Sequence, residues 1–383
     1  MNVEILVDSA AFCARLGQDL ARARERAWVQ TLSFEGDSAG MWLADAMLAS
    51  RARDRRIIVD CYTRVIQSDR FIWLPQNLAD RAVRDEVRST RRMIRTLRQR
   101  GVAVQFTARL GLLLRRMPAR DHKKIMLIDD DVAWIGGVNF SDHNFAWHDM
   151  MLRFEHDGIT RFLADDFTAT WAGGGAAGRV RFDGCELLSL DGVTNERMLV
   201  DLLDRVRSAR RSVVVHNAYV TFPFCDALRD AAGNGAKITV ITPAANNRGF
   251  LRDYMGWEAT RSGFEVRLYP DRMSHLKAML IDDACLIAGS SNFDWLTHRF
   301  QAELIATITR PHTVAQFRTR VLEPDLAISS PITETADHTR GQRADRALRR
   351  IERLARRLCP REPRQRPGPG HQQDIAATPA LTE

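Results

Sequence analysis

The sequence predicts an α/β protein built from two similar halves, each an α/β/α sandwich with a mixed β-sheet. Apolar strand patterns alternate with amphipathic helix patterns along most of the chain, and this alternation favours a mainly parallel or mixed sheet covered on both faces. Similar segments also recur in the same order, and within them five residues of one motif recur 153 positions further on. The repeat predicts two halves that are related by a pseudo-twofold axis and share one site at their interface.

Each half is expected to contain the same elements. It begins with a short strand, an Arg-rich amphipathic helix and an apolar strand; a second helix and a β-branched strand follow, and a further helix leads to a strand introduced by glycine. The matching segments are residues 3–34 and 185–219, 41–62 and 224–243, and 101–106 and 263–269. Because the whole order repeats, we expect the two halves to have the same fold.

The repeat also predicts the domain boundaries. The first half spans residues 1–172, a linker spans 173–183, and the second half spans 184–325. Residues 326–383 are expected to form a basic tail largely without fixed structure, because they are polar and then rich in Pro and Gly. The net charge of +8 is concentrated there, since residues 340–366 hold eleven Arg and three acidic residues. Apolar residues at helical spacing permit one short amphipathic helix in the tail: Leu348, Ile351, Leu354, Ala355 and Leu358.

The strongest signal is the template H-x-K-x4-D-x6-G-[GS]-x-N, which occurs twice. The chain has 52 Arg but four Lys, so chance H-x-K pairs number about 0.1 in the whole chain. Period two puts the His and the Lys on one face of a strand, the Asp begins a turn, and glycines after the returning strand bring the Asn beside them. The pairs are His122 and His275, Lys124 and Lys277, Asp129 and Asp282, Gly136 and Gly289, and Asn139 and Asn292.

This duplicated motif resembles the phospholipase D superfamily, also called HKD enzymes, and the resemblance covers residues 3–325. Within it, the chain is most similar to cardiolipin synthases and phosphatidyltransferases that lack N-terminal membrane spans. The supporting features are the opening strand and helix of each half, the segment DALRDAAGNGAKITVITP, and GSSNFD followed by Glu303. The resemblance implies the phospholipase D fold, with one active site between the halves.

The repeated residues suit displacement at a phosphodiester, without a metal ion or other cofactor. One imidazole attacks phosphorus to give a phosphohistidine, and the other protonates the leaving alcohol and then deprotonates the incoming one. The resemblance implies that His122 is the nucleophile and His275 the acid and base. The Lys and Asn pairs would bind the nonbridging oxygens, and a compact ammonium suits such an oxygen better than the wider Arg fork. We include Asp129 and Asp282 with the catalytic motif, but expect them to anchor turns.

Each imidazole also needs an acceptor that orients its second ring nitrogen. In the resembling family a downstream carboxylate does this. The matching residues are Asp149, 27 residues after His122, and Glu303, 28 residues after His275, which pairs each carboxylate with the histidine of its own half. The sequence departs from the family here, because the first half has Asp rather than Glu and WLTHRFQAE lacks the common Arg-Ser and Asn.

Two weaker signals precede the motifs. Residues 108–121 combine a Leu run with arginines, and Arg115 and Arg116 are candidates for substrate entry, with the loop in a lipid surface and its Arg on phosphates. An ordinary core helix or strand is the alternative for this segment. Residues 246–257 hold the matching place before the second motif and are candidates to line an acyl or acceptor channel.

The function expected from the motif and the resemblance is phosphatidyl transfer, most concretely cardiolipin formation from phosphatidylglycerol. A hydrolase that uses water, either a phospholipase D or a nuclease, is the alternative. A non-catalytic module that binds a membrane or nucleic acid is ranked last, because both motifs are intact. The expected partners are a phospholipid and an anionic membrane surface, which a basic tail attracts; nucleic acid is not expected as a partner but is left open.

Composition narrows the class of protein. Hydrophobic content of 45% and charged content of 27% are typical of a globular protein. No run of about 18 apolar residues predicts a spanning helix, and the N-terminus does not resemble a signal peptide. The six cysteines form no CxxC pair and predict buried free thiols. Together these observations favour a cytoplasmic protein that lies peripherally on the inner face of the membrane.

Overall fold

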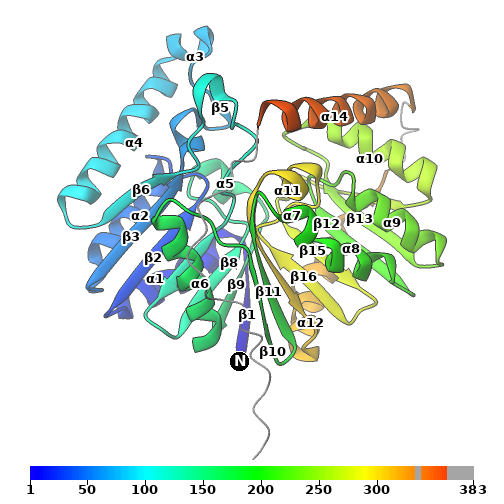
Figure 1. Ribbon diagram of the computed structural model, residues 1–383, viewed down its shortest axis with the longest axis horizontal. Helices are drawn as coiled ribbons and strands as arrows, with labels where there is room; N and C mark the ends of the chain where they lie inside the picture. Colours follow the sequence, from blue (N-terminus) through cyan, green and yellow to red (C-terminus); the bar gives the residue numbers. More distant parts are fainter. Residues whose placement is uncertain (333–337, 360–383) are drawn as a thin grey trace, which may run out of the picture.

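The computed structural model describes residues 1–332 and 338–359. Two large β-sheets pack against each other, and most helices lie on their outer sides (Figure 1). None of the helices in this part of the chain combines the length and apolar character that crossing a membrane requires. Its six cysteines are free thiols, and all except Cys13 are buried, as expected.

The first half forms a seven-stranded sheet in the order β1-β9-β8-β7-β2-β3-β6. Strands β2, β3 and β6 run parallel, and the other pairs are antiparallel. The strands are β1 (Asn2–Val7), β2 (Arg26–Thr31), β3 (Asp54–Asp60), β6 (Ala103–Thr107), β7 (Ile125–Ile128), β8 (Val132–Gly136) and β9 (Met150–Glu155), with a separate hairpin of β4 (Ile66–Gln67) and β5 (Arg70–Phe71). The helices are α1 (Asp8–Arg22), α2 (Ser38–Ala49), α3 (Pro75–Ala79), α4 (Arg81–Gln99), α5 (Asp142–Ala146) and α6 (Asp157–Trp171).

The second half forms a nine-stranded sheet in the order β10-β11-β17-β16-β15-β12-β13-β14-β18. Here β12, β13 and β14 run parallel. The strands are β10 (Gly178–Phe182), β11 (Cys185–Asp191), β12 (Ser212–Asn217), β13 (Lys237–Pro243), β14 (Glu265–Tyr269), β15 (Lys277–Ile281), β16 (Cys285–Gly289), β17 (Ala302–Ile308) and β18 (Ser330–Pro331). The helices are α7 (Asn195–Met198), α8 (Val200–Arg207), α9 (Phe224–Gly233), α10 (Gly249–Ser262), α11 (Trp295–Arg299), α12 (Pro311–Phe317), α13 (Glu323–Ile328) and α14 (His338–Leu358).

The sequence repeat is therefore a repeat of topology. Without its edge strands β10 and β18, the second sheet has the order β11-β17-β16-β15-β12-β13-β14, which matches the first sheet strand for strand. The prediction of two α/β halves with mixed sheets is confirmed. The linker prediction needs correction, because residues 178–182 form β10 and pair with β11. Val180 and Phe182 alternate with arginines in the period-two pattern of a strand, which the preceding glycine run obscured.

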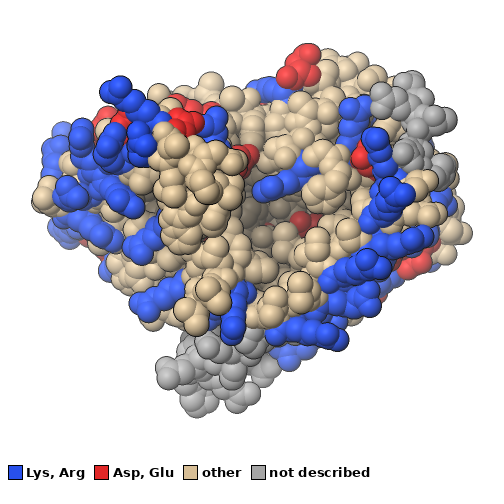
Figure 2. Space-filling model, turned by 90° about the horizontal axis from the view of Figure 1, so that it is seen from above, with Lys and Arg blue, Asp and Glu red and all other residues tan. Residues whose placement is uncertain are grey.

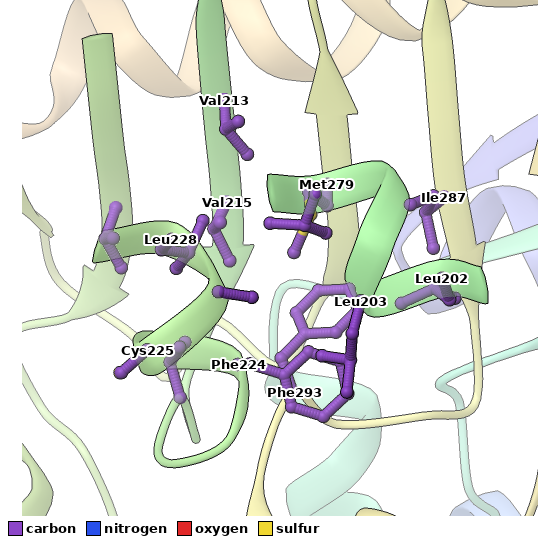
Figure 3. Close-up of a cluster of buried hydrophobic side chains, with 14 of the residues drawn as sticks. Leu202, Leu203, Val213, Val215, Phe224, Cys225, Leu228, Met279, Ile287 and Phe293 are labelled. Carbon is purple, nitrogen blue, oxygen red and sulfur yellow. The ribbon is translucent and has the colours of Figure 1, made fainter. Parts of the chain in front are cut away.

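Apolar side chains fill both faces of each sheet. One outer cluster packs α1, α2 and α4 on the first sheet, and another packs α8, α9 and α10 on the second. Figure 3 shows part of this second cluster, where Phe224 of α9 and Phe293 lie near Val215 of β12. An inner cluster joins the sheets, with Leu127 and Leu280 from the two motif strands, and α6 and α12 also pack into it. Because this inner core is shared, the halves form one folded unit.

The described part of the tail contradicts the prediction that the tail is largely without fixed structure. Residues 338–358 form a helix of 21 residues, longer than the short helix expected, and it packs along α10 (Figure 1). Leu348 and Ala355 are buried against the second half, and Gly341 approaches so closely that an added Cβ would lie 2.1 Å from Trp257 Cβ. Residues 333–337 and 360–383 lie outside the described residues.

Candidate active site

The two copies of the template meet in one cleft of about 400 Å³. Figure 2 looks down on this end of the molecule and shows a hollow with Lys and Arg on both sides. His122 and Asn139 from the first half and His275 and Asn292 from the second half line the cleft. The expected hairpins are present, since β7 pairs with β8 and β15 with β16. The structure therefore brings the two motifs together at the interface of the halves.

The orienting carboxylates are exchanged between the halves. Nδ1 of His122 lies 2.9 Å from Oε1 of Glu303, and Nδ1 of His275 lies 2.7 Å from Oδ2 of Asp149. The expectation that each carboxylate serves the histidine of its own half is wrong. Backbone pairing between the halves is the cause: His122 N donates to Ala302 O (2.9 Å), and His275 N donates to the carbonyl of His148 (2.7 Å). Each motif segment thus runs beside the carboxylate segment of the other half.

Asp149, directly before β9, and Glu303, in β17, occupy equivalent places relative to the two motif hairpins. Gly136 pairs with the second residue after Asp149, and Gly289 pairs with the second residue after Glu303. Gly137 leaves room for the first carboxylate, because an added Cβ would lie 2.2 Å from Asp149 Oδ1. In the second half, the hydroxyls of Ser290 and Thr297 donate to Glu303 instead.

The lysines of the template are buried at the site. Lys124 Nζ donates to the carbonyl of His122 (2.8 Å), and Lys277 donates in the same way to the carbonyl of His275. Both lysine residues are at most 2% exposed. Asn139 is fixed by its Nδ2, which donates to Asn144 Oδ1 (3.3 Å).

Lys123 has a structural role. It is buried and donates to Asp166 (2.6 Å) and to Ser189 of the second half (2.9 Å). The equivalent residue, Leu276, is also fully buried, in the inner apolar core. This position therefore contributes to the contact between the halves rather than to the cleft.

Burial sets the charge of the site. Burial and Lys277 lower the pKa of His275 to about 3, and burial also lowers the pKa of His122, against the raising effect of Glu303. Burial lowers the pKa of Lys124 to about 7 and that of Lys277 to about 8. Both imidazoles are therefore neutral near pH 7 in the free site. A neutral ring that donates Nδ1–H to a carboxylate has an unprotonated Nε2, which is a nucleophile or a base.

Asp129 and Asp282 lie away from the cleft, at the far ends of β7 and β15. Each follows a four- or five-residue strand, so about 13 Å or more separates it from the motif lysine. Asp129 Oδ1 accepts from the backbone N–H of Glu25 (2.8 Å) and Arg26 (3.0 Å), and Asp282 receives three equivalent bonds. These contacts correct the inclusion of Asp129 and Asp282 in the catalytic set. They agree with the prediction that the two aspartates anchor turns.

The segment before the first motif reaches the cleft through other residues than expected. Met117, Pro118 and Arg120 line it, whereas Arg115 and Arg116 are not among the described lining residues. Arg120 is buried and pairs with Asp60 Oδ1 at 2.7 Å. The matching segment of the second half does line the cleft, through residues 247–251 without Gly249.

One group of carboxylates near the cleft has the spacing of metal ligands. Oxygens of Glu35, Asp37 and Glu86 lie within 4.8 Å of one another. Burial and the hydrogen bond with Glu86 raise the pKa of Glu35 to about 9. A proton held between these carboxyl groups near pH 7 relieves their repulsion, so the arrangement does not require a cation.

Aromatic neighbours of His275 were missed from the sequence. The Trp147 ring lies 4.9 Å from the imidazole, and the Tyr219 ring lies 6.1 Å from it, nearly perpendicular. Trp147 stands two residues before Asp149, and this closeness to an orienting carboxylate was an available signal. Tyr219 follows β12 and has no counterpart in the template.

Comparisons with known proteins agree with this geometry. The sequence model of the family described as cardiolipin synthase, PLD-like domain, matches residues 16–171 and 202–323. The major cardiolipin synthase ClsA of Bacillus subtilis is 23% identical over 363 residues, which cover 87% of this chain and 70% of that protein. A cardiolipin synthase of Staphylococcus aureus is 23% identical over 263 residues, or 60% of this chain. The chain spans about half the length of that relative, 51%.

A solved structure supports the fold. The phosphatidylserine synthase of Haemophilus influenzae superposes with a TM-score of 0.67 at 12% identity, covering 92% of this chain and 93% of that one. At this identity the likeness concerns the fold alone. With the match of the family model over most of both halves, the chain belongs to the phospholipase D-like family described as cardiolipin synthase, PLD-like domain.

Proposed function

We propose that the protein transfers phosphatidyl groups between phospholipids, forming cardiolipin and glycerol from two molecules of phosphatidylglycerol. The observation that carries this proposal is the pair of histidines in one cleft, each with Nδ1 held by a carboxylate of the other half. Two such imidazoles supply the nucleophile and the proton carrier that a double displacement at phosphorus needs.

In the first step, Nε2 of His122 attacks phosphorus. The bond between phosphorus and the headgroup oxygen breaks, its electron pair stays on that oxygen, and His275 donates the proton. The products are a phosphatidyl-histidine and the free glycerol headgroup. Burial and Lys277 disfavour protonated His275 in the free site, so the bound phosphodiester anion has to supply the charge that favours imidazolium.

In the second step, an alcohol of a second phosphatidylglycerol attacks the phosphatidyl-histidine. His275 accepts the alcohol proton, the new phosphorus–oxygen bond forms, and the bond to His122 breaks with its electrons returning to nitrogen. Lys124, Lys277 and the two motif asparagines would stabilise the negative oxygens in both transition states. Removing one such donor typically costs on the order of 10²–10³ in rate.

Exposed apolar side chains support a membrane as the substrate's source. Leu112 and Leu113 are 76% and 80% exposed on the loop before the first motif. Ile351, Leu354 and Leu358 of α14 are also exposed, beside several exposed arginines of the same helix. Apolar side chains flanked by Arg suit an anionic lipid surface. We propose that the protein lies peripherally on the inner, cytoplasmic face of the membrane with this end toward the lipid.

The test supplies purified protein with phosphatidylglycerol vesicles and, separately, with labelled DNA. We expect cardiolipin and glycerol from the unaltered protein and from His312→Asn, a change of an exposed histidine on α12, and neither product from His122→Asn. Phosphatidic acid as the sole lipid product would replace transfer by hydrolysis. Cleaved DNA with unchanged lipid would point to a nuclease.

A further inference from the structure

A chain of polar side chains next to His275 has no part in the displacement described above. The Tyr219 hydroxyl donates to Asn247 Oδ1 (2.6 Å), and Asn247 Nδ2 donates to Asp69 Oδ2 (3.1 Å). All three residues line the cleft. The Tyr219 ring contacts the imidazole of His275, so the chain begins beside the reacting atoms and ends on the other half.

The loop that carries Asn247 is fixed by its neighbours. The side chain of Asn246 donates to the carbonyl of Ala218 (2.8 Å) and accepts from the N–H of Arg248 (2.7 Å). The first bond ties the loop after β13 to the segment that follows β12, where Tyr219 lies, and the second fixes the loop's own turn. The amide of Asn247 is therefore positioned before any ligand arrives, which lowers the entropy cost of binding.

Asp69 is fixed independently from the first half. It occupies the turn of the β4–β5 hairpin with φ of 57°. The N–H of the preceding Ser68 donates to Glu35 (2.9 Å), and its hydroxyl donates to Glu86 (2.8 Å). Two of the carboxyl groups with metal-like spacing, those of Glu35 and Glu86, thus hold the turn that presents Asp69 to the cleft.

The three side chains offer complementary bonds to hydroxyl groups. A phenol oxygen that donates its proton keeps lone pairs that accept, a carboxylate accepts at both oxygens, and an amide nitrogen has two hydrogens to donate. Neighbouring hydroxyls of a polyol each donate one bond and accept others. A monohydric alcohol of the same length would leave part of this set without partners, which disfavours it.

We propose that Tyr219, Asn247 and Asp69 form the subsite for the headgroup alcohol and that it selects a polyol with adjacent hydroxyls, such as glycerol. This inference rests on the proposed function. Because one imidazole protonates the leaving alcohol and deprotonates the incoming one, both alcohols occupy the same side of phosphorus. The subsite beside His275 therefore serves the glycerol that leaves and the glycerol group that enters.

The test is a competition between two alcohols for one phosphatidyl-enzyme. Phosphatidylglycerol vesicles are incubated with protein, labelled glycerol and 1-propanol, and the ratio of labelled phosphatidylglycerol to phosphatidylpropanol is measured. Effects on donor binding and on the first step cancel in this ratio. We expect the unaltered protein to favour glycerol, and Tyr219→Phe, Asn247→Ala and Asp69→Asn each to lower the ratio by about 10-fold.

Matched changes outside the cleft are the controls. Asn234→Ala alters an exposed asparagine after α9, and Asp45→Asn alters an exposed aspartate on α2; both should keep the ratio of the unaltered protein. An unaltered protein without preference for glycerol, or variants with an unchanged ratio, would overturn the subsite while transfer itself stands. Absence of every lipid product from the unaltered protein would instead overturn the proposed function, and the subsite with it.

Discussion

Nδ1 of His122 lies 2.9 Å from Oε1 of Glu303, a residue 181 positions away in the other half of the molecule. The reciprocal contact joins His275 to Asp149. Neither template histidine therefore has its carboxylate partner in its own half. Each histidine depends on the interface between the halves for its tautomer and its orientation, and the first prediction follows from which carboxylate serves which histidine.

Asp149→Asn and Glu303→Gln should respond differently to the leaving group. Each change should slow transfer from phosphatidylglycerol by roughly 10²- to 10⁴-fold, because an amide does not stabilise imidazolium as a carboxylate does. A p-nitrophenyl phosphodiester needs no proton on its leaving oxygen. In Asp149→Asn, which affects the acid His275, this ester should restore most of the rate of the first step. In Glu303→Gln, which affects the nucleophile His122, it should not. The burst of p-nitrophenol measures the first step.

The conservative change Glu303→Asp is the control for position, and should keep more activity than Glu303→Gln. Restoration by the activated ester in Glu303→Gln instead of Asp149→Asn would reverse the roles of the two histidines.

A trapped intermediate should identify the nucleophile. In His275→Asn, a p-nitrophenyl phosphodiester should still form the adduct on His122, but no base remains to activate the acceptor, so the adduct should accumulate. Intact-mass measurement after an alkaline quench should show one phosphoryl adduct, and fragmentation should locate it on His122. His122→Asn should show none. An adduct on His275 in the second variant would reverse the assignment.

Anion binding should weaken as pH rises. Burial lowers the pKa of Lys124 to about 7 and that of Lys277 to about 8, and a lysine is charged below its pKa. The site therefore loses these cations between about pH 7 and 8, and above that range a lysine has to take up a proton from solution for the anion to bind. Sulfate keeps its charge over this range, and its inhibition constant should increase by up to about 10-fold per pH unit above pH 8 for each proton taken up.

Inhibition of lipid product formation by sulfate between pH 6 and 9 checks this expectation. Lys237→Met removes a lysine whose side chain is 72% exposed and should keep the profile. A profile without slope in the unaltered protein would mean that both ammonium groups stay charged despite their burial.

The sequence predicted what depends on local pattern. The template located both hairpins and, in each, the His, the Lys, the Gly and the Asn that line the cleft or support it. It could do so because strand period and turn residues are local properties. It did not predict the exchange of Asp149 and Glu303, since single backbone pairs between the halves decide it. The helix at 338–358 was underestimated for the same reason: its apolar residues mark one face, but its stability comes from the surface of α10.

Leu112 and Leu113 should be needed at a lipid surface but dispensable in the cleft. Their side chains are the most exposed large apolar groups in the described residues, and burying two leucines in lipid contributes about 3–6 kcal/mol. Leu112→Ser/Leu113→Ser loses this free energy of burial and should therefore weaken binding to anionic vesicles by about 10-fold or more, measured in a sedimentation assay. Val200→Ser/Ile328→Ser changes two apolar residues of similar type, 47% and 54% exposed on α8 and α13, and should bind as the unaltered protein does. Short-chain phosphatidylglycerol below its micelle concentration needs no membrane, so both double variants should transfer it at the unaltered rate.

Equal vesicle binding by the two double variants would show that this loop does not contact the membrane surface.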